Sequence, residues 1–413
     1  MTRVLIIGGT GFIGRHCVGA LTAAGHSVTA LGRSGLDLVR DGGAAMAAGL
    51  TGHDVVINAA GLVRGYGSNT MAAVHGQGTQ RLVQACLAAG VSRLIHLSAL
   101  GASTEGGTPY QQTKGLGEDV LKAASGLECC VLRPSVVIGR GGASTTVLTA
   151  LAALPWPPRI GPGIWMVQSV HVDDLAELVV RLVEAKGALP GSLDVVGPAP
   201  MTTDGLTMAL RIWLGLPSRS FLPVPEALLG VIASLGERLM NGPLNRDIVA
   251  MLKAGNTADS KPFTTVLGRA PRRLEEALAR HPACEADGMA ARLFFVRPLL
   301  RWSLGLLWLI TGLLSFGLYP VADSYRLLTG IGLDGVTADL ALYGGAVLDL
   351  GLGILLLIGW RPVVLGMAML ASMATFSLLA LGLPAEFWLH PFAPLFKNLP
   401  IAAATLAMMA MEA

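Results

Sequence analysis

Val4-Leu5-Ile6-Ile7-Gly8-Gly9-Thr10-Gly11-Phe12-Ile13-Gly14-Arg15 consists of a short apolar run, a glycine-rich turn and the start of a helical pattern. In such a stretch Gly8 permits the tight turn, Gly11 lets the backbone approach a pyrophosphate, and Gly14 lets the helix pack closely on the strand. Phosphates would lie at the helix amino terminus, where free amide groups and the helix dipole favour an anion. The stretch therefore predicts a nucleotide-binding unit of strand, turn and helix.

Short β-branched runs alternate with helix-like stretches up to about residue 200. The runs expected to be strands are Val4 to Ile7, Ser27 to Leu31, Val55 to Asn58, Leu94 to Ser98, Cys130 to Arg133 and Leu193 to Val196. Strands separated by helices pair in parallel, so we expect a doubly wound α/β sheet. Residues 201 to 290 are expected to add a small helical substrate lobe. The alternative for Pro225 to Met240 is an amphipathic helix on a membrane surface.

The composition indicates a membrane-embedded part and excludes several classes of site. Only 14% of residues are charged and the mean hydropathy is +0.59, against roughly 25% charged in soluble domains. Lys and Arg number 30 and Asp and Glu 27, and no basic block occurs, so we expect no nucleic-acid partner. The five cysteines lack CxxC or metal-ligand spacing, so no metal or disulfide is assigned.

Four apolar segments near the end of the chain are expected to cross a bilayer. Their approximate ranges are 300–322, 340–360, 362–385 and 392–413. The fourth has the weakest pattern, because Lys397 and two prolines lie near its start. Asp349 is the ionisable residue deep inside a span, and it is expected either to mark a functional path or to form a polar contact between helices.

Charged residues are distributed unevenly around these segments. Before the first segment and between the second and third the chain carries Arg292, Arg297, Arg301 and Arg361, whereas the other loops carry Asp323, Asp334, Asp339 and Glu386. The positive-inside rule then places both termini in the cytoplasm. The apolar run before Gly8 is too short for the core of a signal peptide, so the amino-terminal part is expected to be cytoplasmic too. The expected location is the bacterial inner (plasma) membrane.

Three side chains supply what hydride transfer to a carbonyl needs. Tyr110 and Lys114 stand four residues apart on an expected helix, and Ser98 ends the strand before it. The Lys114 ammonium would lower the pKa of Tyr110 and hold a nicotinamide ribose, so that Tyr110 gives its proton to the alkoxide. Ser98 would hydrogen-bond the same oxygen. With the glycine-rich turn, these residues predict an oxidoreductase site.

The residues after the second strand bear on the choice of coenzyme. Arg33 stands where NAD-preferring proteins usually place an acidic residue, and a guanidinium there binds a 2′-phosphate bidentately. We therefore expect NADP(H) to be preferred, with NAD(H) as the alternative. Asp37 and Leu38 follow closely and are expected to hold the adenine, with the usual third strand much abbreviated.

A series of motifs in order resembles the short-chain dehydrogenase/reductase superfamily. The motifs are GGTGFIG, INAAG (Ile57 to Gly61), HLSALGA (His96 to Ala102), Tyr110 to Lys114, LRPSVVIG (Leu132 to Gly139) and VHVDDLA (Val170 to Ala176). The chain is most similar to the atypical branch that includes the Rossmann-type accessory subunit of respiratory complex I. This resemblance implies a Rossmann-like domain over residues 1–290. It also implies further coenzyme contacts from Thr10, Phe12, Ile13, Ala59, Ala60, Gly61, Lys114, Pro134 and Ser135, of which the last two would flank the nicotinamide.

Residues 291–413 resemble the DoxX-like family of four-helix membrane domains, including the Lys397-Asn398-Leu399-Pro400 start of the last span. We therefore expect a Rossmann-like sheet with a small lobe, followed by an all-α four-helix transmembrane bundle. The expected function is membrane-anchored, NAD(P)H-dependent reduction or oxidation of a lipophilic carbonyl or alcohol, such as a quinone-, isoprenoid- or sterol-like compound. The alternative is a non-catalytic nucleotide-binding scaffold or assembly factor for a membrane respiratory or lipid/quinone-biosynthesis complex.

Overall fold

A computed structural model describes residues 1–65, 67–225, 228, 246–383 and 396–412 of the 413-residue chain. The chain divides into two compact units, Met1–Arg292 and Leu293–Ala413. Each unit is described by itself. Most of the stretch Pro225 to Met240 lies outside the described residues, and so do residues 392–395 of the fourth expected span.

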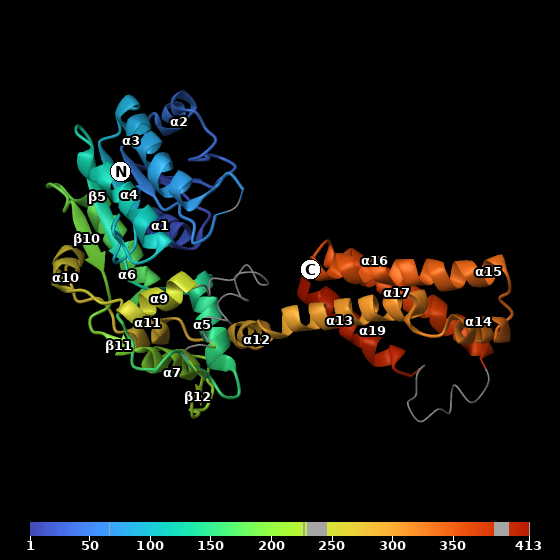
Figure 1. Ribbon diagram of the computed structural model, residues 1–413. Coiled ribbons are helices and arrows are strands. Elements are labelled where there is room, and N and C mark those ends of the chain that lie inside the picture. Colours follow the sequence, from blue (N-terminus) through green and yellow to red (C-terminus); the bar gives the residue numbers. More distant parts are fainter. Residues whose placement is uncertain (66, 226–227, 229–245, 384–395, 413) are drawn as a thin grey trace. The chain divides into compact units, whose positions relative to one another are not determined.

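A six-stranded parallel sheet forms the centre of the first unit (Figure 1). Its strands are β1 (Arg3–Ile7), β2 (Ser27–Leu31), β3 (Val55–Asn58), β4 (Arg93–Leu97), β5 (Glu128–Pro134) and β10 (Ser192–Val195). Their order across the sheet is β10-β5-β4-β3-β1-β2, which confirms the predicted doubly wound topology. The chain order reverses between β1 and β3, and in such sheets ligands bind beyond the carboxyl ends of the strands at that point.

Side chains of one strand alternate between two apolar cores. In β1, Val4 and Ile6 point into one core and Leu5 and Ile7 into the other. The first core is covered by α1 (Phe12–Ala23), α6 (Val172–Glu184) and α10 (Lys261–Leu267). The second is covered by α2 (Gly43–Leu50), α3 (Gly78–Ala88) and α4 (Pro109–Ala123). The central strands β1, β3, β4 and β5 are therefore covered on both faces, as their continuous apolar runs predict, whereas the edge strand β2 has no fully buried residue.

A third apolar core belongs to the lobe. Its helices are α5 (Ala143–Ala153), α7 (Thr203–Trp213), α9 (Arg246–Ala254) and α11 (Leu274–Arg280). Three short two-stranded sheets, separate from the central sheet, are also present: β6 (Val137–Ile138) with β9 (Val170–His171), β8 (Met166–Val167) with β11 (Met201–Thr202), and β7 (Pro158–Arg159) with β12 (Leu222–Pro223). Ile138, Leu206 and Leu278 are all buried in this core. The helix α12 (Glu285–Leu293) then begins the passage to the second unit.

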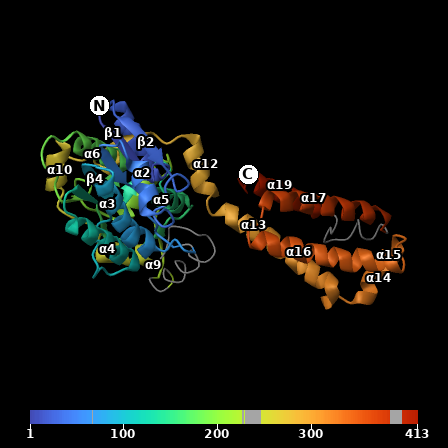
Figure 2. The same ribbon diagram turned by 90° about the horizontal axis from the view of Figure 1, so that it is seen from above.

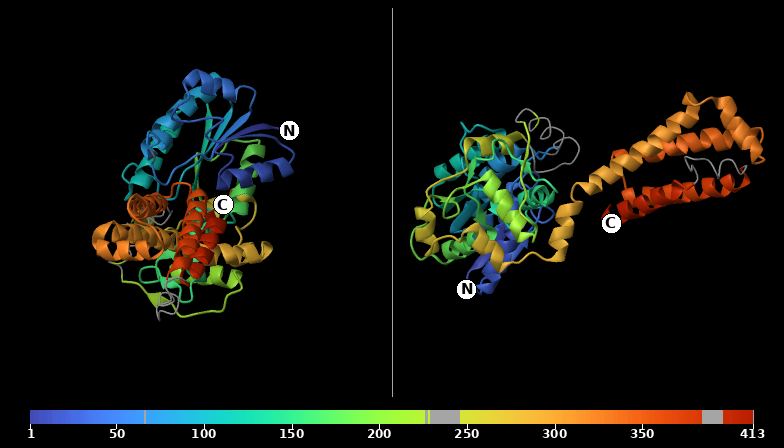
Figure 3. Two further views of the ribbon diagram at one scale, coloured as in Figure 1. Left: turned by 90° about the vertical axis from the view of Figure 1, so that its right-hand side faces the viewer. Right: turned by 90° about the horizontal axis from the view of Figure 1, so that it is seen from below.

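The second unit is helical (Figures 2 and 3). It contains α13 (Val296–Leu313), α14 (Val321–Gly330), α15 (Val336–Asp339), α16 (Gly345–Leu357), α17 (Pro362–Leu379) and α19 (Asn398–Glu412). Helices α13 and α16 pack closely because glycines face the partner backbone. A Cβ atom at Gly312 would lie 2.8 Å from the Leu350 nitrogen, and one at Gly353 would lie 2.6 Å from the Leu309 nitrogen. This small-residue packing is typical of membrane helices.

Three helices among the described residues are long and apolar enough to cross a membrane: Glu285–Leu318, Val336–Leu357 and Pro362–Gly382. The first ends earlier than its expected range of 300–322, because Gly317 leaves helical geometry and Pro320 follows. The described part of the fourth, α19, has 15 residues. Asp349 is buried within α16, and its Oδ1 atom has no hydrogen-bond partner among the described residues.

Candidate active site

The glycine-rich turn fits a dinucleotide because its backbone is too close-packed for other residues. Gly8 has φ +78°, and a Cβ atom on it would lie 2.8 Å from the Ala59 carbonyl carbon. A Cβ atom on Gly14 would lie 2.2 Å from the Gly8 carbonyl oxygen. The amides of Gly8 and Gly9 both donate to the Leu31 carbonyl, at 2.8 and 3.0 Å. The turn is thereby fixed below the start of α1, where a pyrophosphate would be held.

The other predicted residues of this turn have different surroundings. Thr10 is exposed and borders Gly32, whose added Cβ would lie 2.7 Å from the Thr10 hydroxyl oxygen. Phe12 lies near Gly142, whose added Cβ would be 2.9 Å from the Phe12 ring, and Ile13 packs against the first core. The structure therefore leaves Thr10 accessible to a ligand, whereas the Phe12 and Ile13 side chains serve packing.

In the loop after β2, the predicted coenzyme residues Arg33 and Asp37 differ in exposure and in their contacts. Arg33 is exposed. Asp37 is buried, and its Oδ1 atom accepts hydrogen bonds from the amides of Val39 at 2.8 Å and Arg40 at 3.3 Å. Leu38 is buried in the second core. The Asp37 side chain thus stabilises its own turn, and an adenine contact at this place would fall to the backbone.

The loop after β3 lies against the helix that carries Tyr110 and Lys114. The Ala59 amide donates to the Ile7 carbonyl at 2.8 Å, and the Ala60 amide to the Asn58 side chain at 3.1 Å. Gly61 follows, and a Cβ atom there would lie 3.3 Å from the Lys114 ammonium nitrogen. Residues 59–61 and Lys114 are therefore brought together at the switch point, and their role as coenzyme contacts stays a prediction.

Helix α4 positions the expected catalytic residues. Its amino terminus is capped by Thr108, whose hydroxyl accepts from the Gln111 amide at 3.2 Å, and Pro109 starts the first turn. Tyr110 and Lys114 come one turn apart. The Lys114 ammonium is buried and donates to the Leu97 carbonyl at 2.7 Å, at the end of β4. The dyad is thus fixed at the carboxyl edge of the sheet.

Ser98 is engaged differently from the expectation that it holds the substrate oxygen. Its hydroxyl donates to Glu118 at 2.6 Å, and both side chains are buried. Glu118 also pairs with Arg133, whose Nε atom lies 2.9 Å from Oε1. Glu118 stands two turns after Tyr110, about 12 Å further along the helix axis. A serine has one hydroxyl proton, and in this arrangement that proton is directed to Glu118.

Burial changes the pKa values of the dyad. It raises the pKa of Tyr110 to about 12, opposite to the direction expected from a neighbouring ammonium. It lowers the pKa of Lys114 to about 8, although Glu118 acts in the opposite sense. Burial is the cause of the Tyr110 shift, and for Lys114, whose ammonium donates to the Leu97 carbonyl, burial outweighs the attraction of Glu118. Tyr110 is therefore a neutral proton donor at physiological pH, and Lys114 is a titrating cation.

Pro134 ends β5 and Ser135 follows it, and both are buried. The Pro134 carbonyl accepts from the Leu100 amide at 3.0 Å, and the Ser135 amide donates to the Val195 carbonyl at 3.0 Å. The Ser135 hydroxyl is 3.4 Å from the Asn256 carbonyl oxygen. These contacts join the sheet to the lobe, which is the side where a nicotinamide is expected.

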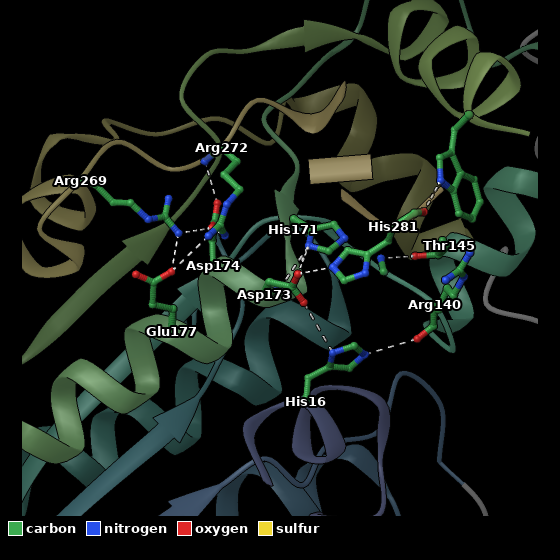
Figure 4. Close-up of polar contacts among 12 residues, drawn as sticks. His16, Arg140, Thr145, His171, Asp173, Asp174, Glu177, Arg269, Arg272 and His281 are labelled. Atoms are coloured by element: carbon green, nitrogen blue, oxygen red, sulfur yellow. Dashed lines mark hydrogen bonds and ion pairs between the residues drawn. The ribbon is translucent and has the colours of Figure 1, made fainter. Parts of the chain in front are cut away.

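A second polar cluster joins α1, α6 and the lobe (Figure 4). Asp173 lies among three histidines: His281 at 2.6 Å, His171 at 3.5 Å and His16 at 3.8 Å. The neighbouring Asp174 pairs with two arginines, one of which is Arg269 at 2.6 Å. No group with the geometry of a metal site occurs among the described residues. We interpret the cluster as structural, because it ties the segment before α12 to α6.

Sequence reasoning missed His75, Glu118 and Arg133. Glu118 is four residues after Lys114 on one helix face, and Arg133 is on the strand beside Ser98, so helix and strand periodicity could have suggested the pair. His75 is 2% exposed and contacts Tyr110 edge to face, with ring centroids 5.9 Å apart. No spacing signal in the sequence points from His75 to Tyr110.

Comparison with known proteins agrees with this geometry. Residues 4–195 match the NAD dependent epimerase/dehydratase family, and residues 305–406 match the DoxX-like family. The chain is 31% identical over 264 residues to the epimerase family protein SDR39U1 of Mus musculus, which covers 57% of this chain and 87% of that protein. The chain belongs to the NAD-dependent epimerase/dehydratase family. The predicted short-chain dehydrogenase/reductase type, NAD(P) as the coenzyme class and the DoxX-like second domain are confirmed.

Three further proteins are similar to parts of this chain. The chain is 31% identical over 192 residues to the ceramide reductase of Caulobacter vibrioides, covering 43% of this chain and 59% of that protein. It is 28% identical over 151 residues to the mitochondrial NADH dehydrogenase [ubiquinone] 1 alpha subcomplex subunit 9 of Mus musculus, covering 36% and 38%. Human SDR39U1, whose structure was solved with NADPH, shares the fold at TM-score 0.53 and 24% identity, covering 67% of this chain and 98% of that one.

Proposed function

We propose that this enzyme is a membrane-anchored, NADPH-preferring reductase of a lipophilic carbonyl compound. The observation that carries the proposal is the presence of a Tyr110–Lys114 dyad and a dinucleotide cradle in the same chain as helices that, in its described part, are long and apolar enough to cross a bilayer. An enzyme held at the membrane meets substrates that partition into lipid. The similarity to a ceramide reductase supports a lipid carbonyl over a soluble sugar.

Each residue of the site would have a separate role in the reaction. A bound nicotinamide would supply the hydride. Tyr110, whose pKa is raised to about 12, would donate the proton, and Lys114 would stabilise the phenolate left behind. Glu118 and Ser98 would hold the end of β4 against α4, so that Lys114 keeps its place beside Leu97.

The choice of coenzyme is proposed from the loop after β2. Arg33 is exposed at the end of this strand and can reach a 2′-phosphate, and a guanidinium binds such a group with two parallel hydrogen bonds. The related human protein solved with NADPH supports the same preference. NAD(H) is the alternative.

The membrane placement is proposed from charge distribution. Arg297 and Arg301 lie in the first turns of α13, and Arg361 precedes α17, so these ends of the helices face the cytoplasm under the positive-inside rule. We therefore propose that the nucleotide-binding unit and both chain termini lie on the cytoplasmic side of a bacterial inner membrane, where NADPH is available.

A second candidate function rests on the similarity to the accessory subunit of complex I. In that alternative the chain binds a nucleotide without turning over a substrate and supports assembly of a membrane complex. The presence of both Tyr110 and Lys114 favours the enzyme, because a scaffold needs neither a buried cation nor a proton donor.

One experiment separates the two functions. The full chain in lipid nanodiscs is given NADPH and a panel of ketones of increasing chain length, and coenzyme oxidation is followed. We expect long-chain ketones to be reduced, and the Tyr110→Phe variant to lose roughly a hundredfold or more in rate while binding NADPH normally. In a deletion strain, full complementation by Tyr110→Phe together with failure of Gly11→Trp would establish the scaffold instead.

A further inference from the structure

His75 lies in a π-helical turn, Ala73–Gln77, immediately before α3. Its side chain is 2% exposed. Its carbonyl oxygen accepts from the Thr79 hydroxyl at 2.6 Å, and an added Cβ on Gly117 of α4 would lie 2.5 Å from that same oxygen. Single π-helical turns are uncommon and occur frequently at functional sites. The turn brings the His75 ring to the place where three segments of the candidate active site meet.

The two ring nitrogens of His75 have defined roles. The Leu62 amide donates to Nε2 at 3.0 Å, and because an amide can only donate, Nε2 carries no proton. The proton is therefore on Nδ1, which donates to the Thr113 hydroxyl at 3.0 Å. The Thr113 hydroxyl in turn donates to the Tyr110 carbonyl at 3.1 Å. One continuous set of hydrogen bonds thus runs from Leu62 to Tyr110.

The ring also occupies the space between these segments. It meets the Tyr110 ring edge to face, with an interplanar angle of 82°. A Cβ atom on Gly61 would lie 3.7 Å from His75 Nε2 and 3.3 Å from the Lys114 nitrogen. The imidazole is therefore in contact with the loop after β3 on one side and with the dyad helix on the other.

The imidazole stays neutral under physiological conditions. Burial first, and the charge of Lys114 second, lower the pKa of His75 to about 3. Protonation would also remove the acceptor that the Leu62 amide uses. The ring consequently cannot act as an acid or base in the reaction near neutral pH, and its contribution is a fixed geometry.

We infer that His75 is a positioning residue that joins the coenzyme-contacting loop Ala59–Leu62 to the helix carrying Tyr110 and Lys114. This inference rests on the proposed function for its catalytic consequence. His75 sets the separation between the place where a dinucleotide backbone would run and the phenol that delivers the proton. Its ring meets the Tyr110 ring edge to face, and it has no part in the proton transfer itself.

The test uses three variants of the full chain in nanodiscs. His75→Gln carries an amide oxygen where Nε2 stood, so it can still accept from Leu62. His75→Phe keeps a ring of similar size and loses both hydrogen bonds. His53→Phe is the matched control, because His53 also bonds through both ring nitrogens, to Leu50 at 3.2 Å and Thr29 at 3.0 Å, away from the dyad.

Three measurements are made on each variant: hydrogen exchange of the peptide containing Leu62, the Kd for NADPH, and thermal unfolding. We expect His75→Phe to speed exchange at Leu62 and weaken NADPH binding roughly tenfold, since the partly buried Leu62 amide loses its acceptor. His75→Gln should restore both to within about threefold. His53→Phe should leave both at wild-type values.

Wild-type exchange at Leu62 and wild-type NADPH affinity in His75→Phe would overturn the inference. If His75→Phe and His75→Gln weaken NADPH binding equally while Leu62 exchange is restored in the second, the positioning role is also overturned. A wild-type chain that binds no dinucleotide would instead disprove the proposed function, and the exchange at Leu62 would still report on the loop contact.

Discussion

Ser98 donates its hydroxyl proton to Glu118 at 2.6 Å, in a buried site where Glu118 also pairs with Arg133. The Arg133 side chain is 24% exposed and that of Glu118 is 1% exposed, so the pair is largely removed from water. Removing one member of such a pair costs more than removing a neutral hydrogen-bond donor, because it leaves a charge without compensation. Loss of the Glu118 charge should therefore reduce stability more than loss of the Ser98 hydroxyl does.

Glu118→Gln should destabilise the first unit by about 3 kcal/mol, whereas Ser98→Ala should cost about 1 kcal/mol. Denaturant unfolding of the full chain in nanodiscs measures both. We expect Ser98→Ala to keep its rate of ketone reduction within about threefold, since its proton is directed to Glu118. A hundredfold loss of rate at unchanged stability would show instead that Ser98 contacts the substrate.

Gly14→Ala should prevent coenzyme binding, because the new methyl group would lie 2.2 Å from the Gly8 carbonyl oxygen. Helix α1 would have to move away from the turn, at a cost of about 1 to 3 kcal/mol in stability. Gly19→Ala on the same helix is the control, since nothing lies within 4 Å of its added Cβ. It should raise stability by about 0.5 to 1 kcal/mol. Titration with NADPH and thermal unfolding test both variants, and equal NADPH affinities would contradict the cradle.

Arg33→Ala should weaken NADPH binding roughly tenfold to a hundredfold, because a bidentate, charge-assisted contact to the 2′-phosphate is lost. Binding of NADH, which lacks this phosphate, should stay the same and serves as the internal control. Titration of the wild type and the variant with both coenzymes gives the ratio of the Kd for NADH to the Kd for NADPH in each protein. Equal losses for the two coenzymes would assign Arg33 a structural role and remove the basis for NADPH preference.

The rate of ketone reduction should be constant near pH 7 and fall as pH rises through about 8. The Tyr110 pKa of about 12 keeps the proton donor intact over this range, while Lys114 loses its charge above its pKa of about 8. The loss of the cation removes stabilisation of the phenolate, so the sign is a decrease with pH. Single-turnover rates of ketone reduction, measured at saturating NADPH over a range of pH, test this decrease. In Lys114→Arg the fall should disappear up to about pH 10, since a guanidinium remains charged.

Glu412→Gln should destabilise the second unit by about 1 to 2 kcal/mol. Glu412 ends α19 and pairs with Arg297 at 2.6 Å and Arg301 at 3.6 Å, both at the start of α13. The expected loss of stability is smaller than for a fully buried pair, because the Arg297 side chain is 52% exposed and screened by solvent. The exposed pair Arg326–Asp323 supplies the control, and Arg326→Ala should change stability by less than about 0.5 kcal/mol. Thermal unfolding in nanodiscs measures both variants, and equal melting temperatures for Glu412→Gln and Arg326→Ala would contradict the prediction.

The sequence by itself determined the strands, the glycine turn and the apolar helices. These features depend on local patterns: β-branched runs four or five residues long, a glycine spacing between a strand and a helix, and apolar segments of about 20 residues. For this reason β2 and β3 were predicted with the bounds that the structure has. The predicted end of the first membrane helix, near residue 322, was too late, because Gly317 and Pro320 stop the helix within an uncharged segment.

Only the tertiary structure decided how the side chains of the site are used. The spacing of Ser98, Tyr110 and Lys114 predicted one site, yet the direction of the Ser98 hydroxyl depends on Glu118 and Arg133, which come from a different turn and a different strand. The raised pKa of Tyr110 reflects burial that no local pattern contains. His75 likewise reaches Leu62 and Thr113 across 13 and 38 residues of chain. Such contacts arise from packing between distant segments, and single-sequence periodicity carries no information about them.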